Sequence, residues 1–84
     1  MDIAKFKSLL DEQITWPDYY TFKFVVKTEQ ETQVLALLDG HKIESKASSK
    51  GTYISISSRK LMQSSEEVVA VYNLLSQVEG IMSL

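Results

Sequence analysis

The chain has 84 residues, and its 9 basic and 11 acidic side chains give a formal net charge of −2. Hydrophobic residues make up 44% and charged residues 24% of the sequence, which is the balance of one soluble globular domain. Cysteine is absent and His41 is the single histidine, which excludes disulfides, thiol nucleophiles and zinc sites built from these residues. No apolar run approaches the roughly 18 residues of a transmembrane helix, and Asp2 argues against a secretory signal. We therefore expect a cytoplasmic protein that needs no cofactor and no metal.

A stripe of apolar side chains at helical spacing runs through residues 1–15. It comprises Ile3, Phe6, Leu10 and Ile14, with Leu9 widening it. The residue before Pro17 is disfavoured in the helical conformation, so the helix should end by Trp16. We expect residues 1–15 to form an N-terminal helix or arm, and residues 16–84 to form the domain itself.

Residues 20–27 alternate in the manner of a strand with one buried face. The side chains expected in the core are Tyr20, Phe22, Phe24 and Val26, and those expected in water are Lys23 and Lys27. The sequence from Thr28 to Glu31 has the capping-box pattern, in which a hydroxyl caps a helix and a glutamate follows three residues later. It predicts a helix that begins at Thr28 and ends before Gly40, a residue that readily takes the left-handed backbone of a helix end.

Residues 42–47 have little apolar content and three charged side chains, which indicates an edge strand. After a polar turn, residues 52–58 form the next predicted strand, in which Ile54 and Ile56 face the core and Tyr53 faces away. A slip of one residue would reverse these faces and place Tyr53 inside.

A second capping box, from Ser64 to Glu67, predicts the start of a helix of about four turns that reaches Val78. Gly80 ends this helix, and residues 81–84 form a short terminal strand. The order after the first helix is therefore β-α-β-β-α-β, which is the ferredoxin-like arrangement of an α+β domain. We expect a four-stranded antiparallel sheet with two helices on one face, plus the N-terminal helix. The other face is open, and it must be polar or paired with a partner.

Basic residues concentrate in residues 42–60, where five of them accompany a single acid, Glu44, and give a local charge of +4. The rest of the chain holds 4 basic and 10 acidic residues, a charge of −6. One interpretation is a solvated hairpin whose lysines prevent edge-to-edge aggregation. The other is a contact surface for an acidic partner. The candidate residues of this surface are Lys46, Lys50, Tyr53 and Arg59.

The turn at residues 48–51 has the sequence S-S-K-G. Its backbone amides form either a small anion-binding nest or an ordinary hairpin turn. Tyr53 beside Lys23 on the open face would resemble the platforms on which single-stranded RNA stacks its bases. The other aromatic residues of the first strand are expected in the core, so nucleic-acid binding is the less favoured hypothesis.

Catalytic groups are hard to find in this sequence. His41 follows Gly40 and is expected to be a solvent-exposed turn residue, and no Ser/His/Asp set can be proposed around it. Glu66 and Glu67 are explained by helix capping and by the helix dipole. We therefore expect that the protein is not an enzyme.

Two segments resemble the bacterial YbeD-like family, a family of unknown function. Residues 16–26, W-P-D-Y-Y-T-F-K-F-V-V, are similar to its aromatic-Pro opening, and residues 48–55, S-S-K-G-T-Y-I-S, are similar to its most specific segment. The last helix and strand also fit, so the resemblance covers the chain from about residue 14 to its end. It implies a small cytosolic bacterial protein with a ferredoxin-like fold close to the ACT regulatory domains. It also implies a regulatory role, inferred from that fold and from gene proximity to lipoate metabolism.

Three hypotheses follow for the function. The first is a non-enzymatic regulatory or adaptor module that acts through protein contacts, with another protein or a second copy of the chain as its partner. The second is an ACT-like dimer whose paired sheets hold a small-molecule effector between them. The third, less favoured, is an RNA-binding module.

Overall fold

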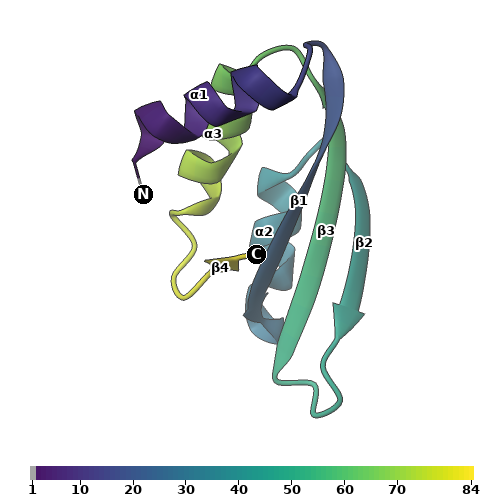
Figure 1. Ribbon diagram of the computed structural model, residues 1–84. Helices are drawn as coiled ribbons and strands as arrows, with labels where there is room; N and C mark the ends of the chain where they lie inside the picture. Colours follow the sequence, from purple (N-terminus) through teal and green to yellow (C-terminus); the bar gives the residue numbers. More distant parts are fainter. Residues whose placement is uncertain (1) are drawn as a thin grey trace.

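The computed structural model describes residues 2–84, and in them it contains three α-helices, one 3-10 helix and four strands (Figure 1). In chain order these are α1 (Ile3–Gln13), β1 (Asp18–Lys27), η1 (Thr28–Gln30), α2 (Glu31–Leu37), β2 (Lys42–Ala47), β3 (Tyr53–Met62), α3 (Ser65–Leu75) and β4 (Met82–Ser83). The strands form one antiparallel sheet in the order β2-β3-β1-β4. The predicted ferredoxin-like βαββαβ order is thus confirmed, with α1 as the additional N-terminal helix.

The two central strands, β1 and β3, are both longer than the sequence predicts. They pair along their whole length, from Asp18 opposite Met62 to Lys27 opposite Tyr53. Because β1 begins at Asp18 rather than at Tyr20, Leu61 and Met62 of β3 also have partners across the sheet. The backbone hydrogen bonds to β1 extend β3 through a segment that shows no clean alternation of apolar and polar residues.

The two outer strands differ in how firmly they are held. β2 pairs with β3 and forms one edge of the sheet, as predicted. β4 pairs with β1 at only two positions, Phe24 opposite Ser83 and Val25 opposite Met82. The backbone N–H of Leu84 adds one hydrogen bond of 2.8 Å to the carbonyl oxygen of Lys23. The terminal strand is therefore shorter than the predicted residues 81–84.

One face of the sheet forms the hydrophobic core together with the helices. Ile54 and Ile56 are buried and Tyr53 is exposed, so the predicted faces of β3 are confirmed and the one-residue slip does not occur. β1 contributes its predicted apolar set, although Tyr20 is only half-buried. The fully or nearly buried side chains of the central strands and helices include Phe22, Phe24, Val26, Val34, Leu38, Val68 and Leu75.

The helix after β1 begins later than predicted, and Thr28 does not cap it. Residues 28–30 form a 3-10 turn, and no side chain caps the start of α2. The Thr28 hydroxyl instead donates a hydrogen bond of 2.6 Å to the carbonyl oxygen of Gly51, in the turn between β2 and β3. The capping-box prediction is wrong here because a partner distant in the sequence takes the hydroxyl. Gly40, with φ of 84°, has the predicted left-handed backbone.

The second capping box is confirmed at the start of α3. The Ser64 hydroxyl oxygen accepts a hydrogen bond of 3.4 Å from the backbone N–H of Glu67. The Glu67 carboxylate accepts one of 3.2 Å from the backbone N–H of Gln63, one residue before the cap. The helix ends at Leu75, so it has about three turns rather than four. Val78 is still buried, because the loop that follows folds back onto the core.

Helix α1 lies against α3 at the side of the core (Figure 1). Leu10 is buried in the core, and the Asp2 carboxylate caps the helix by accepting a hydrogen bond from the backbone N–H of Lys5. Lys7 forms an ion pair of 2.7 Å with Glu66 at the start of α3. Leu9 is 45% exposed, so the predicted widening of the apolar stripe is wrong: the contact with α3 is narrower than the sequence pattern.

Among residues 2–84, no helix lies on the other face of the sheet (Figure 1). Helices α2 and α3 lie on the core side of the sheet, as Figure 1 shows, and no element of residues 2–84 covers the opposite side. Within this described part of the chain, no helix has the length and hydropathy required to span a bilayer.

Candidate functional site

The open face of the sheet is built from the side chains that alternate with the core residues. Successive side chains of a strand point to opposite faces, and residues paired across strands share a face. The open face, as used below, comprises Tyr19, Thr21, Lys23, Val25 and Lys27 of β1, Tyr53, Ser55, Ser57, Arg59 and Leu61 of β3, and Lys42, Glu44 and Lys46 of β2. Val25 and Ser57 are half-buried, and the other members are exposed.

This face is strongly basic in a chain that is acidic overall. It carries five cations and one carboxylate, a charge of +4. The remaining 4 basic and 10 acidic residues give the rest of the chain a charge of −6. The cations of the open face are Lys23, Lys27, Lys42, Lys46 and Arg59. The fold therefore gathers positive charge on the open face of a chain whose other residues are negative overall, and a surface with such a charge attracts anions.

The centre of the open face is hollowed into a shallow depression of about 330 Å³. We call it the basic hollow, and it is lined by Thr21, Lys23, Lys42, Glu44, Ser57, Ser58 and Arg59. Lys42 and Thr21 lie opposite Arg59 on its two sides, in one row across three strands. Neighbouring strands are about 4.8 Å apart, so the side chains of a row lie within reach of one small ligand.

The cations of the basic hollow are not neutralised within the protein. Lys7 with Glu66 is the single ion pair found among residues 2–84, so Lys23, Lys42 and Arg59 have no carboxylate within 4.0 Å. The Arg59 guanidinium lies 4.3 Å from the centre of the Tyr19 ring, a cation–π contact that holds it in place. Positioned cations without partners are what an anionic ligand requires.

Residues 11–84 match the family described as "Protein of unknown function (DUF493)". The chain belongs to this family. A relative described as "UPF0250 protein", from Shewanella piezotolerans (strain WP3 / JCM 13877), is 33% identical over 78 residues, which cover 84% of this chain and 89% of the relative. No solved structure shows a significant match to the chain. The resemblance of the two sequence segments to a bacterial YbeD-like family of unknown function is thus confirmed.

The four residues predicted for a partner surface do not form one patch. Lys46, Tyr53 and Arg59 lie on the open face, but Lys50 lies in the turn beyond its end. Tyr53 and Arg59 are six residues apart on β3, a separation of about 20 Å along the strand. Arg59 lines the basic hollow, whereas Lys46 lies outside it on the edge strand, opposite Ser55. Tyr53 and Lys50 lie at the hairpin end.

The four predicted residues also leave out three cations of the open face, which are Lys23, Lys27 and Lys42. Lys23 and Lys27 were predicted to face water, and the register aligns them with β3, with Lys23 opposite Ser57 and Lys27 opposite Tyr53. Tyr53 is therefore beside Lys27 and not beside Lys23 as the RNA hypothesis assumed. The alternation of apolar and polar residues in β1 already shows that these two lysines point outward. Only the pairing of β1 with β3 shows which residues of β3 they lie beside.

The S-S-K-G turn uses part of its backbone for its own hydrogen bonds. The N–H of Gly51 donates to the carbonyl oxygen of Ser48 at 2.9 Å, and the N–H of Tyr53 donates to the Ser48 hydroxyl oxygen at 3.2 Å. The carbonyl oxygen of Gly51 accepts from Thr28. These bonds favour the ordinary hairpin turn over the anion-binding nest.

His41 is not the exposed turn residue that the sequence predicts. It is half-buried, and its ring centre lies 5.8 Å from that of Phe22. Its Nδ1 atom is buried and has no hydrogen-bond partner. Burial, together with the positive charge of Lys60, lowers the pKa of His41 below its usual value of 6.5. The position fits a neutral imidazole that packs against the core.

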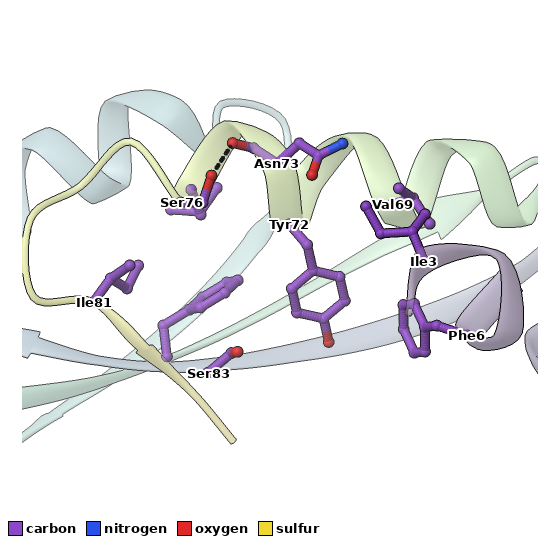
Figure 2. Close-up of a pocket in the computed structure, with 10 residues that line it drawn as sticks. Ile3, Phe6, Val69, Tyr72, Asn73, Ser76, Ile81 and Ser83 are labelled. Atoms are coloured by element: carbon purple, nitrogen blue, oxygen red, sulfur yellow. Dashed lines mark hydrogen bonds between the residues drawn. The ribbon is translucent and has the colours of Figure 1, made fainter. Parts of the chain in front are cut away.

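A second cavity, of about 240 Å³, lies between α1, α3 and the C-terminal segment. Figure 2 shows Tyr72 in its middle, with Ile3 and Phe6 of α1 on one side and Ile81 and Ser83 on the other. The Tyr72 hydroxyl lies 3.3 Å from that of Tyr20, and burial raises the pKa of Tyr72 above its usual range. The lining is mostly apolar, and no feature of the sequence pointed to it, because it arises where three separate segments meet.

Proposed function

We propose that this protein is a non-enzymatic regulatory or adaptor module of the cytoplasm that binds an acidic protein surface through its open sheet face. The observation that supports this function is the charge of that face, five cations against one carboxylate, on the side of the sheet that no helix of residues 2–84 covers. Electrostatic complementarity of this kind accelerates association and selects partners of opposite charge.

Apolar side chains at both ends of the open face supply the contact area that charge alone does not. Tyr19 and Leu61 are 53% and 40% exposed and lie opposite each other at one end. Tyr53 is 43% exposed at the other end, diagonally across from Val25, which is itself opposite the exposed Met82 of β4. Rigid aromatic and aliphatic anchors contribute most of the binding energy in protein interfaces, and the cations between them set the orientation.

A second copy of the chain is a poor partner for this face. Two open faces brought together would place +4 against +4, and like charges in contact oppose association. Single-stranded RNA also fits badly, because Tyr19 and Tyr53 lie at opposite ends of the face and the Arg59 guanidinium covers Tyr19. The stacking of bases on RNA-binding sheets requires exposed aromatic rings at the centre.

The test compares two charge-reversed variants of the tagged full-length protein. Lys46→Glu/Arg59→Glu reverses charge on the open face, and Lys5→Glu/Lys60→Glu makes the same change in net charge away from it. We expect a protein captured from the native lysate, and then purified, to bind the second variant as it binds the wild type. Its binding to the first should be at least tenfold weaker, and wild-type binding should weaken as salt is raised. Equal binding to both variants would refute the proposal.

The second candidate is small-ligand sensing, and the apolar cavity under α1 favours it. This cavity lies on the helix side of the sheet, and not between paired sheets as in the ACT-like arrangement. Its mostly apolar lining would take an uncharged apolar molecule. A compound that raises the melting temperature of the wild type but not of Val69→Phe, in which the added ring fills the cavity, would support this function.

A further inference from the structure

We propose that the basic hollow binds a phosphate monoester. This inference rests on the proposed function insofar as it uses the same face, and it names the chemical group that the face recognises. The open-face residues of the hollow are three cations, two hydroxyls and one carboxylate around the centre of β1, β2 and β3, and the buried Ser58 completes the lining. The open-face residues lie in two rows across the sheet, one through Arg59 and one through Ser57.

The charge of the hollow matches a dianion. Lys23, Lys42 and Arg59 against Glu44 give +2, and a phosphate monoester carries a charge close to −2 at pH 7 and above. A carboxylate or a phosphodiester carries only −1 and would leave one cation uncompensated. The match therefore favours a terminal phosphate over a carboxylate or a nucleic-acid backbone.

The arrangement of Lys42 and Arg59 gives a physical reason for an anion between them. They lie directly opposite each other on neighbouring strands, and like charges in such a pair destabilise a sheet. No carboxylate lies within 4.0 Å of either among the described residues. An anion bound between the two side chains replaces repulsion by two attractions, so binding should also stabilise the fold.

The donors around the hollow suit the tetrahedral oxygens of a phosphate. Arg59 offers a planar pair of N–H groups, already oriented by its contact with Tyr19. The ammonium groups of Lys23 and Lys42 come from the strands on either side. Thr21 and Ser57 add hydroxyl donors between them. Glu44, at the end of the Ser57 row, repels a second anionic group and so directs the rest of the ligand away from β2.

The direct test is a nuclear magnetic resonance titration of the full-length chain with inorganic phosphate at pH 7.5, with ionic strength held constant by sodium chloride. We expect saturable shifts of the backbone amides of Lys42, Ser57 and Arg59, and a rise in melting temperature with phosphate. Lys42→Gln/Arg59→Gln should lower the affinity at least tenfold. The matched control, Lys27→Gln/Lys46→Gln, loses the same charge from the same face outside the hollow and should bind within twofold of the wild type.

Two further outcomes decide the proposal. Glu44→Gln removes the one carboxylate, and its affinity for phosphate should rise severalfold. Amide shifts that do not saturate with phosphate would mean diffuse attraction to a charged surface and would overturn the site. An equal loss of phosphate affinity in the two double variants would have the same meaning. Each variant's amide spectrum shows independently whether it is folded.

The phosphate can belong to a modified side chain of a protein or to a phosphorylated metabolite. A peptide containing phosphoserine that binds at least tenfold more tightly than free phosphoserine would identify the protein source. Glucose 6-phosphate binding at least as tightly as the peptide would identify a metabolite. If a partner protein binds the wild type but not Lys46→Glu/Arg59→Glu, and the wild type does not bind phosphate, the docking function is retained and the phosphate site is rejected. If the wild type binds phosphate but no partner protein binds the open face, the phosphate site is retained and the docking function is rejected.

Discussion

The hydroxyl of Thr28 donates a hydrogen bond of 2.6 Å to the carbonyl oxygen of Gly51, 23 residues further along the chain. The backbone N–H of Thr28 also donates to the neighbouring Thr52 carbonyl oxygen at 3.1 Å. These two bonds tie the end of β1 to the turn between β2 and β3. They hold the hairpin end of the open face against the central strand.

Substitutions of Thr28 distinguish this tie from a helix cap. Thr28→Val should lower the free energy of unfolding by about 0.5–1 kcal/mol, because the hydroxyl donor is lost. Thr28→Ser should be close to wild type, and Thr28→Asp should be as destabilising as Thr28→Val, because an ionised carboxylate cannot donate. Urea unfolding measures all three. If Thr28→Asp were stabilising, Thr28 would be acting as a cap, since aspartate is a preferred cap residue.

Leu10 attaches α1 to the rest of the fold. Leu10→Ala should lower the free energy of unfolding by about 2–3 kcal/mol, the lower part of the range for buried leucines, because α1 contacts the core at one side only. Leu9→Ala makes the same chemical change at a 45% exposed position of the same helix and should cost less than about 0.5 kcal/mol. If the two substitutions lowered the free energy of unfolding equally in urea experiments, the contact of Leu10 with the core would not be what attaches α1 to the fold.

His41 should make stability depend on pH in the mildly acidic range. Its pKa is lowered by burial and by Lys60, so the unfolded chain binds a proton more readily than the folded protein. The stabilising contribution is complete above the unfolded value of 6.5 and is lost as the pH falls below it. The urea concentration at the unfolding midpoint of the wild type should therefore decrease as the pH is lowered from 8 to 5.5. His41→Gln should show a smaller fall, and an identical fall would exclude this role.

Glu66 should titrate well below the usual range of glutamates. The hydrogen bond from Lys7 is the largest cause that lowers the pKa of Glu66 to about 2, with its own backbone N–H and the Ser64 hydroxyl contributing. Its contribution to stability is present above the usual value of 4.5 and is lost as the pH falls towards 2. Carboxyl carbon shifts in a pH titration should show this value. The same titration should give a higher pKa for Glu66 in Lys7→Gln, but not in the control Lys5→Gln.

The parts of the fold that the sequence predicts are those determined by local pattern. The alternation from Tyr20 to Val26, and that around Ile54, identify both central strands and their faces. The Ser64 cap is equally local. Thr28 and His41 were predicted wrongly because Gly51 and Phe22, the residues that decide their environment, are distant in sequence.

The candidate site was only partly predictable for the same reason. Counting charge along the chain grouped Lys50 with Arg59, which the fold separates, and left out Lys23, which the fold brings into the basic hollow. The register of β1 against β3 decides which cations share a face. No residue-by-residue pattern contains that register, although the alternation within each strand does show which side chains point outward.

The brevity of β4 has a consequence for the motions of the molecule. β1 is held by β3 along its full length but by β4 at only two positions, so the C-terminal segment should detach from the sheet long before the central pair separates. Ile81 and Ser83 form one wall of the apolar cavity under α1. Fluctuations of this end would therefore widen the cavity and admit molecules to it, while the charged face on the other side of the sheet keeps its shape. The two sides of one small domain would thus respond on different timescales.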